Sequence, residues 1–268
     1  MNKQIPTELL KLELRKLQIK VAEESRSNFL TFVKKVWPDF ISGPHHKIIA
    51  KKFEDISRGK IKRLIVNMPP RHTKSEFASN LFPAWMMGRN PKLKIIEATH
   101  TAELSYNFGR KVRNLFDQQE FQDVFPDVSL SQDSKAAGRF TTNKGGEYFA
   151  AGVGGAITGR GADLLIIDDP HSEQDALSES SFDKAYDWYT SGPRQRLQPG
   201  GAIVIVMTRW STKDLTGQLI KAQTQKKVLS LNVSGGRYGN MIRYLIFHTL
   251  YKVMIQRLVK EKLQTLVP

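Results

Sequence analysis

The stretch Leu64-Ile-Val-Asn-Met-Pro-Pro-Arg-His-Thr-Lys-Ser75 joins an apolar run to a helical pattern that continues as Glu76-Phe-Ala-Ser-Asn-Leu-Phe82. The apolar run predicts a buried strand over residues 64–68, and the pattern after it predicts a helix over residues 74–87. A lysine beside a hydroxyl residue at a helix start suits phosphate, because the first backbone N–H groups of a helix have no partner within it. We therefore interpret the stretch as a phosphate-binding loop between a strand and a helix.

The glycines of the usual phosphate-loop pattern are missing from this stretch. The pattern is G-x-x-x-x-G-K-[ST], and Met68 and Thr73 stand at its two glycine positions. What remains is Lys74, which can reach the β- and γ-phosphate oxygens, and Ser75, whose hydroxyl can bind Mg²⁺. Arg71 adds a planar cation that can bridge phosphate oxygens. A surface loop followed by an ordinary helix cap explains the stretch equally well when it is taken alone.

A second segment, Gly161-Ala-Asp-Leu-Leu-Ile-Ile-Asp-Asp-Pro170, supplies two adjacent carboxylates. Its apolar residues predict a buried strand that ends at Asp168 and Asp169. An aspartate at such a strand end is the second support that a phosphate loop gives to Mg²⁺. We expect Asp168 to hold the metal, in part through water, and Asp169 to orient or deprotonate the attacking water. The alternative is a paired turn acid before Pro170, but the order and strand-end positions of the two segments favour function.

A third apolar run, Ile203-Val-Ile-Val-Met207, ends in the polar residues Thr208 and Arg209. Thr208 is expected to sense the γ-phosphate, and Arg209 to contact phosphate or DNA. A strand-end turn with a structural tryptophan at Trp210 explains this segment almost equally well.

Strand and helix patterns alternate through the middle of the chain. Strands are expected over residues 64–68, 94–99, 147–151, 164–168 and 202–208. Helices are expected over residues 74–87, 102–116, 179–189 and 212–221. This alternation predicts an α/β fold with a mainly parallel sheet that helices cover on both faces. Sheets of this kind bind ligands beyond the carboxyl ends of their strands.

The region before the first strand is expected to be helical, over residues 8–24, 27–36 and 45–56. Four apolar residues of the first helix share one face: Leu10, Leu14, Leu17 and Val21. We expect that face to pack on the core rather than on a membrane or a partner helix. The polar segment 117–144 is expected to be irregular.

The composition points to a polyanionic partner. The net charge of +15 favours nucleic acid, and residues 226–268 contribute +7 of it, since they hold eight Lys or Arg and one acid, Glu261. The chain has no cysteine, which excludes disulfides and thiolate metal sites. We see no signal peptide at the start, and residues 241–255 are too short and too charged to span a bilayer, so no membrane partner is expected.

With these segments in view, the chain resembles the large terminase subunit of tailed bacteriophages. The matching stretches are NMPPRHTKSEFASNLFPAWMMGRNP, IIEATHTAELSYNFGRKVRN, GVGGAITGRGADLLIIDDPHSEQDA and GGAIVIVMTRWSTKDLTGQL. The resemblance covers residues 25–222 and concerns the ATPase part only. It implies a P-loop ATPase of the additional-strand type that assembles as a homo-oligomeric ring on the procapsid portal and pumps double-stranded DNA with ATP and Mg²⁺. It also implies a small terminase subunit as partner, and a location in the host cytoplasm and transiently on the portal, not in the mature virion.

The resemblance assigns roles to the residues of the three segments. Lys74, Arg71 and Asp169 are the catalytic residues, with Arg71 acting on the phosphates in cis. Ser75 and Asp168 are the metal ligands, and Thr208, with Arg209, is the coupling motif. The ATP-binding residues are Pro70, Arg71, His72, Thr73, Lys74 and Ser75, together with His46. The catalytic carboxylate is often Glu in the family, so Asp169, with its shorter side chain, is a departure.

Two further points follow from the resemblance. The adenine-contacting region maps near residues 43–46, where His45 or His46 is expected to stack on the base or to hydrogen-bond to it. Thr73 replaces the usual glycine before the lysine. Because threonine resists a positive φ angle, we expect either a different backbone shape in the loop or a weaker nucleotide affinity.

The end of the sequence departs from the family. Residues 226–268 do not resemble the family's linker, and a single carboxylate cannot build the two-metal site of its nuclease domain. We expect no nuclease activity from this chain and interpret the tail as a frameshift, a split gene or a truncated reading frame; the alternative is a basic DNA-holding helix over residues 242–263. The domains expected are a helical lead-in (1–60), the ATPase core (61–225) and the basic tail (226–268).

Two other functions stay open at this point. One is a helicase-like ATPase of the same fold, which would separate DNA strands, whereas a packaging motor moves along the duplex without separating them. The other is a remnant that binds DNA or portal and hydrolyses no nucleotide.

Overall fold

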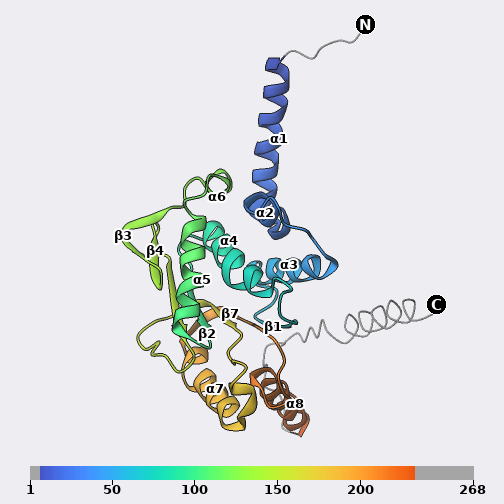
Figure 1. The fold of residues 1–268 in the computed structure, drawn as a ribbon, viewed down its shortest axis with the longest axis vertical. Helices are drawn as coiled ribbons and strands as arrows, with labels where there is room; N and C mark the ends of the chain where they lie inside the picture. Colours follow the sequence, from blue (N-terminus) through green and yellow to red (C-terminus); the bar gives the residue numbers. More distant parts are fainter. Residues whose placement is uncertain (1–6, 233–268) are drawn as a thin grey trace, which may run out of the picture.

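The computed structural model describes residues 7–232, apart from the side chains of residues 134, 135, 179 and 224–232. The expected tail therefore lies largely outside the described residues. A seven-stranded sheet in the order β1-β7-β6-β2-β5-β4-β3 forms the centre of the molecule (Figure 1). The strands are β1 (Arg63–Asn67), β2 (Lys94–Thr99), β3 (Leu130–Ala136), β4 (Arg139–Thr142), β5 (Glu147–Gly152), β6 (Ala162–Asp168) and β7 (Leu197–Met207).

The sheet is mainly parallel, as the alternating pattern predicted. Strands β1, β7, β6, β2 and β5 run parallel to one another, and β4 and β3 extend the β5 edge in antiparallel pairs. Strand β7 lies between β1, which leads into the phosphate loop, and β6, which ends in the two aspartates. That inserted strand is the additional strand of the P-loop class named above, so the expected fold class is confirmed.

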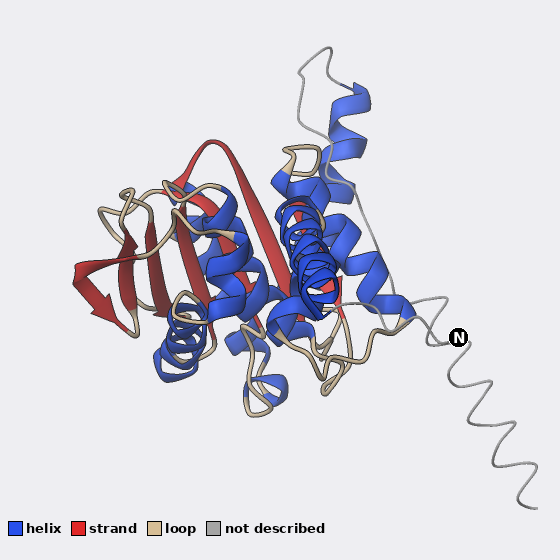
Figure 2. Cartoon of the chain, turned by 90° about the horizontal axis from the view of Figure 1, so that it is seen from above, coloured by secondary structure: helices blue, strands red, loops and turns tan. Residues whose placement is uncertain are grey.

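The helices are listed here in chain order: α1 (Thr7–Ser27), α2 (Phe29–Val36), α3 (Pro44–Ser57), η1 (Glu76–Leu81), α4 (Phe82–Arg89), α5 (Ala102–Leu115), α6 (Gln119–Val124), α7 (Glu179–Ser191) and α8 (Leu215–Asn232). Short 3₁₀ segments, η2 (Asp175–Leu177) and η3 (Pro193–Arg196), flank α7. Figure 2 shows these helices around the strands. Among the described residues, no helix is both long and apolar enough to cross a bilayer.

Two hydrophobic clusters, one on each face, hold the helices to the sheet. Side chains alternate between the faces of a strand, so in β6 Leu164 and Ile166 join the larger cluster, while Leu165 and Ile167 join the smaller one. The larger cluster includes the apolar residues of α2, α3 and α4, and the smaller one includes those of α7 and α8. Both faces of the central strands are buried, which explains their uninterrupted apolar sequences.

Three expectations about local structure were wrong. Residues 117–144 contain α6, β3 and β4, although their sequence is largely polar. Strand β4 pairs with β5, and β3 pairs with β4, at the edge of the sheet, and few of their side chains, among them Phe140, are buried in the core. Helix α8 does not end at residue 221 but continues to Asn232, across the boundary expected at residue 225.

The third correction concerns α1, whose expected packing face is exposed. Leu10, Leu14 and Leu17 are 61%, 60% and 62% exposed, and α1 stands away from the body of the molecule in Figure 1. Burial begins only at Ala22 and Ser25, where the helix reaches α2 and α6. Spacing along a helix shows which residues share a face but cannot show whether any neighbour covers that face.

An aromatic cluster joins the helical lead-in to the helix that follows the phosphate loop. Its centre is Phe29 of α2, which is fully buried. The ring of Phe29 lies 5.5 Å from that of Phe53 in α3, 5.6 Å from that of Phe77 in η1, and 5.3 Å from that of Trp85 in α4. The lead-in is therefore part of the same core as the sheet.

Replacing Phe29 with alanine is expected to lower the free energy of unfolding by about 3–5 kcal/mol, because it removes a buried ring and leaves a cavity among four helices. Urea denaturation followed by circular dichroism measures the change. Ile41→Ala is the control: Ile41 is 88% exposed, and its loss should change stability by less than about 0.5 kcal/mol. Equal losses in the two variants would contradict a core centred on Phe29.

Candidate nucleotide-binding site

The three sequence segments meet at one edge of the sheet. Asn67 of β1 pairs with Met207 of β7, and Val206 of β7 pairs with Asp168 of β6, so the carboxyl ends of these strands are level. The phosphate loop, the two aspartates and Thr208 leave the sheet side by side. Parallel strands place ligand sites at this edge.

An ion pair closes the site between the phosphate loop and the end of β6. Lys74 Nζ lies 2.6 Å from Asp169 Oδ2, with the lysine side chain 8% exposed and the aspartate 27% exposed. The other carboxylate oxygen, Asp169 Oδ1, accepts a hydrogen bond of 2.7 Å from the backbone N–H of Thr208. One carboxylate thus joins residues from all three segments.

Asp168 lies deeper, and its surroundings fit a divalent cation. Its Oδ2 accepts a hydrogen bond of 2.8 Å from Ser79, and its Oδ1 is buried without a hydrogen-bond partner. Burial and, after it, the charge of Asp169 raise the pKa of Asp168 to about 7, while hydrogen bonds from Ser75 and Ser79 act in the opposite direction. A buried carboxylate oxygen with no partner, beside the Ser75 hydroxyl, is a donor set that suits Mg²⁺.

A cluster of three or more His, Cys, Asp or Glu side chains placed to hold a metal is absent from residues 7–232, as far as their side chains are described.

Two residues that the sequence interpretation did not single out, Glu97 and Ser79, lie on the core side of Asp168. Glu97 of β2 is fully buried and accepts a hydrogen bond from the Tyr148 hydroxyl. Burial and, after it, the nearby charge of Asp168 raise the pKa of Glu97 well above its usual range. Ser79 contacts Asp168 from the helix after the loop. Two signals were available: Ser79 follows Ser75 by one helical turn, and Glu97 is an acid among the apolar residues of a strand.

The backbone at this edge contains left-handed residues that are not glycine. Arg71 has φ = 62°, Thr73 has φ = 60° and Asp169 has φ = 41°, and no other residue in the described part of the chain except glycine has a positive φ. Such conformations cost energy and concentrate at functional sites. Of the two alternatives expected at Thr73, a different backbone shape is excluded, since Thr73 adopts the conformation that a glycine would favour. The effect on nucleotide affinity stays a prediction.

The remaining loop residues divide into an exposed and a buried set. Pro70 and Arg71 are exposed, and the Arg71 guanidinium forms no hydrogen bond or ion pair within the described residues, which leaves it available to a ligand. His72 is half-buried, and its Nδ1 lies 2.8 Å from the carbonyl oxygen of Pro70. His46 is buried behind the loop, against the rings of Phe40 and Phe77.

His46 contacts the loop rather than open solvent. Its Nε2 lies 2.5 Å from Thr73 Oγ1, and its Nδ1 accepts a hydrogen bond of 2.8 Å from the Gly43 N–H. Burial, and then the nearby His45 and His72, lower the pKa of His46 to about 4, so the ring is neutral at physiological pH. A contact of His46 with an adenine base stays a prediction.

Thr208 and Arg209 connect the site to α8. Thr208 Oγ1 donates a hydrogen bond of 3.3 Å to the carbonyl oxygen of Met68, at the start of the phosphate loop. Arg209 Nε donates to Asp214 Oδ2 at 2.8 Å, and Asp214, which is fully buried, also accepts from the Gly217 N–H in the first turn of α8. Asp214 was not singled out from the sequence, although an acid just before a helix is a common N-terminal cap.

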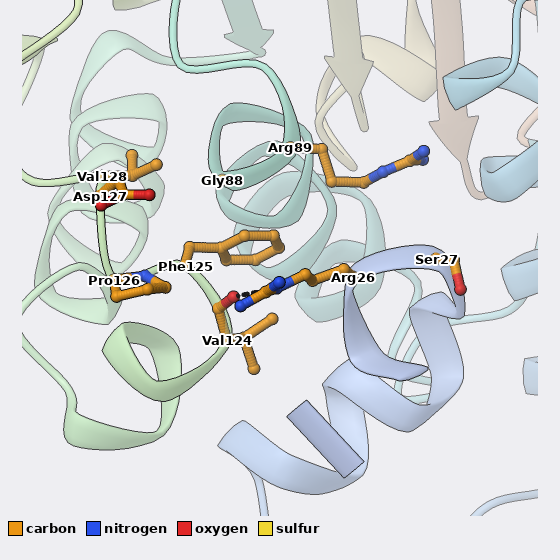
Figure 3. Close-up of a pocket in the computed structure, with 9 residues that line it drawn as sticks. All are labelled: Arg26, Ser27, Gly88, Arg89, Val124, Phe125, Pro126, Asp127 and Val128. Atoms are coloured by element: carbon orange, nitrogen blue, oxygen red, sulfur yellow. Dashed lines mark hydrogen bonds between the residues drawn. The ribbon is translucent and has the colours of Figure 1, made fainter. Parts of the chain in front are cut away.

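A cleft of about 450 Å³ lies elsewhere, between α1, α4 and α6 (Figure 3). It is lined by Gly88 and Arg89 at the end of α4, and Arg26 crosses it to donate a hydrogen bond of 2.8 Å to the carbonyl oxygen of Val124. The helical segment η1–α4 starts at the carboxyl-end edge of the sheet and ends just before β2 begins, so this cleft lies near the opposite edge. It contains none of the predicted site residues.

The strand order, with β7 between β1 and β6, is the order expected for the additional-strand P-loop fold. No protein-family model matches the chain, and no curated protein is significantly similar to it. Among solved structures, the chain is similar to the HK97 bacteriophage large terminase, with 13% identity and a TM-score of 0.48 over 75% of this chain. The chain spans 42% of that terminase's length. The LAO/AO transport system kinase is also similar, with 14% identity and a TM-score of 0.22 over 98% of this chain and 88% of that one.

Breaking the Lys74–Asp169 pair is expected to show strong energetic coupling. Lys74→Ala and Asp169→Asn each leave the partner charge poorly compensated, whereas the double variant leaves neither. The two changes should therefore be non-additive in the free energy of unfolding, with a coupling of about 1–3 kcal/mol without nucleotide.

Urea denaturation of the four proteins of this cycle measures the coupling. The matched control is the Glu13–Lys16 pair of α1, whose side chains are 55% and 62% exposed. Its cycle should give about 0.5 kcal/mol or less. Additive effects of the two changes at Lys74 and Asp169 would show that their ion pair is absent in solution.

Proposed function

We propose that this chain is the ATPase part of a DNA-packaging motor of the phage large-terminase kind. The observation that carries the proposal is the contact of Lys74 and Thr208 with one carboxylate, Asp169, beside the buried and unsatisfied Oδ1 of Asp168. A basic loop residue, two strand-end acids and a polar residue at the end of the inserted strand are the parts that ATP hydrolysis requires.

ATP is the substrate, and its phosphates lie over the phosphate loop. The backbone N–H groups at the start of the helix face them, and Lys74 and the unpaired Arg71 guanidinium supply positive charge. Pro70, His72 and Thr73 shape this loop. His46 belongs to the adenine-side region that the family resemblance implies.

Asp168 and Ser75 are the residues that would hold Mg²⁺. When bound there, the metal would neutralise charge on the phosphate oxygens. Ser79 holds Asp168 Oδ2 from the core side by a hydrogen bond, and Asp168 Oδ1 has no protein partner among the described residues.

Asp169 is the proposed general base. In the nucleotide-free chain its Oδ2 is bound to Lys74. Phosphate oxygens attract Lys74 in turn, and its movement towards them frees Oδ2 to accept a proton from water. The water oxygen then forms a bond to the γ-phosphorus while the bond from that phosphorus to the bridging oxygen breaks, and ADP leaves with the electron pair. Because Lys74 must leave Asp169 for the phosphates first, Asp169 can act as a base only when nucleotide is bound.

Thr208 and Arg209 are the proposed coupling residues. Thr208 touches both Asp169 and the first residue of the loop region, Met68, so a shift of either reaches the end of β7. From there the Arg209–Asp214 contact continues to α8. A nucleotide-dependent change at the Asp169 carboxylate would thus be transmitted through these hydrogen bonds to α8.

The proposed partners rest on the family resemblance and on charge. They are double-stranded DNA, the portal of the procapsid, the small terminase subunit and further copies of this chain in a ring, met in the host cytoplasm and transiently at the portal. The net charge of +15 supports a polyanionic partner. Translocation without strand separation distinguishes this motor from a helicase-like ATPase, so an unwinding assay separates the two.

Phosphate release from ATP and Mg²⁺ is expected in the wild-type chain and should increase with double-stranded DNA. Asp169→Asn should lower the rate by about 10²–10⁴-fold, the usual contribution of a general base, and Lys74→Ala should lower it at least as far. Lys184→Ala is the control, because the Lys184 side chain is exposed on α7 and is not one of the proposed site residues. Turnover that survives both substitutions would contradict the assigned site. Nucleotide binding without turnover, even with DNA, would favour the non-hydrolysing remnant.

DNA binding should depend steeply on salt, because contacts to phosphates release bound counterions. For about six phosphate contacts, the affinity for a double-stranded fragment should fall by about 10³-fold between 50 and 200 mM salt, with little dependence on sequence. Fluorescence anisotropy with two fragments of unrelated sequence measures both properties. A flat salt response would contradict a polyanion-binding role for the excess charge.

A further inference from the structure

Thr73 raises a physical problem that the hydrolysis scheme leaves unsolved. Its φ of 60° is in the left-handed region, where the Cβ substituents of a β-branched residue crowd the backbone. A glycine would adopt this conformation at no steric cost. Thr73 also stands directly before Lys74, so a change of its backbone would redirect the start of the helix that receives the phosphates. Some other contact must stabilise this conformation.

The stabilising contact is a chain of hydrogen bonds that ends at the Thr73 side chain. Gly43 N–H donates to His46 Nδ1 at 2.8 Å, so Nδ1 carries no proton and the proton of the neutral ring is on Nε2. Nε2–H then donates to Thr73 Oγ1, at 2.5 Å. The Thr73 hydroxyl in turn donates to the carbonyl oxygen of His72, at 2.6 Å. Every member of the chain has a defined donor or acceptor role.

The imidazole of His46 is held by packing as well as by its hydrogen bonds. Its ring lies 4.8 Å from that of Phe40 and 4.9 Å from that of Phe77. It is in the first turn of α3, and α3 is anchored in the core by Ile49 and Phe53. The position of Nε2 is therefore set by a packed helix, so Thr73 is bound to a rigid part of the molecule.

We propose that His46 is a positioning residue which holds Thr73 in its left-handed conformation and so compensates for the glycine that the phosphate loop lacks. This inference rests on the proposed function, because it explains how a glycine-free loop keeps a shape that receives the phosphates of ATP. It assigns His46 a role that is exerted through Thr73, whether or not the ring also touches the base.

Two substitutions of His46 separate the two hydrogen bonds that it makes. His46→Gln keeps an N–H donor at the reach of Nε2 and so can still bind Thr73. His46→Asn keeps a polar group at the reach of Nδ1, which can still accept from Gly43 N–H, but it is too short for Thr73. Titration with Mg·ATP should show about tenfold weaker binding for His46→Asn, and a much smaller change for His46→Gln. The reverse order would mean that His46 acts only by capping α3.

Substitutions of Thr73 test the same contact from the loop side. Thr73→Val keeps the branched shape and removes the hydroxyl, so it should weaken Mg·ATP binding about as much as His46→Asn does. Thr73→Ser keeps the hydroxyl and should bind nearly as well as the wild type. Thr73→Gly removes the strain, so His46→Asn should have little further effect in that background. An undiminished tenfold loss in the Thr73→Gly background would overturn the proposal.

A cycle of unfolding measurements tests the contact without any nucleotide. His46→Asn and Thr73→Gly should be coupled by about tenfold in the unfolding equilibrium constant, which corresponds to about 1.4 kcal/mol. The matched control is His45→Asn with Thr73→Gly. His45 is the neighbouring histidine, its Nε2 has no hydrogen-bond partner in the structure, and its cycle should be additive. Equal coupling in the two cycles would contradict a specific contact of His46 with Thr73.

The two sets of measurements distinguish the failure of this inference from that of the proposed function. A wild-type chain that binds no Mg·ATP but shows the His46–Thr73 coupling would contradict the ATPase proposal and leave the loop contact intact. A chain that binds Mg·ATP but shows no coupling, and no difference between His46→Asn and His46→Gln, would contradict the positioning role alone.

Discussion

The ion pair of Lys74 with Asp169 is the interaction on which the organisation of this edge depends. It joins the loop after β1 to the loop after β6, and the Thr208 N–H adds the end of β7 to the same carboxylate. Because Lys74 is almost fully buried, its charge requires a partner. In the structure Asp169 is that partner, and under the proposed function a phosphate group of ATP would compete with it.

Behind this pair, two buried carboxylate oxygens of the described residues have no hydrogen-bond partner, Asp168 Oδ1 and Glu97 Oε1. Tyr148 binds Glu97, and Ser79 binds Asp168, yet Asp168 Oδ1 has no partner. Buried polar atoms without partners are rare in folded proteins and call for an explanation. Together with three left-handed residues other than glycine at the same edge, this oxygen indicates that the site is built for a ligand and not for maximum stability.

The sequence predicted the central elements well because their burial is recorded in their residues. The strand over 94–99 was predicted with its observed bounds, and the strands that become β1, β5, β6 and β7 were each found from uninterrupted apolar runs. The prediction that residues 117–144 are irregular failed because β3 and β4 are held mainly by backbone pairing at the sheet edge. Such pairing leaves little pattern in the side chains. The prediction that the apolar face of α1 packs on the core failed because periodicity shows which residues share a face but not which element lies against it.

For the candidate site, the sequence by itself determined which residues can do chemistry: Lys74 and Ser75 at a helix start, two aspartates at a strand end, and Thr208 after a third strand. Their spacing along the chain also implied one edge of a parallel sheet. Only the tertiary structure decided their contacts, namely that Asp169 rather than Asp168 binds Lys74, that Ser79 and Glu97 stand behind Asp168, and that His46 reaches Thr73. The physical reason is that a strand or helix pattern fixes the direction of a residue within its own element. Hydrogen bonds and ion pairs between residues far apart in the chain depend on the packing of separate elements against one another.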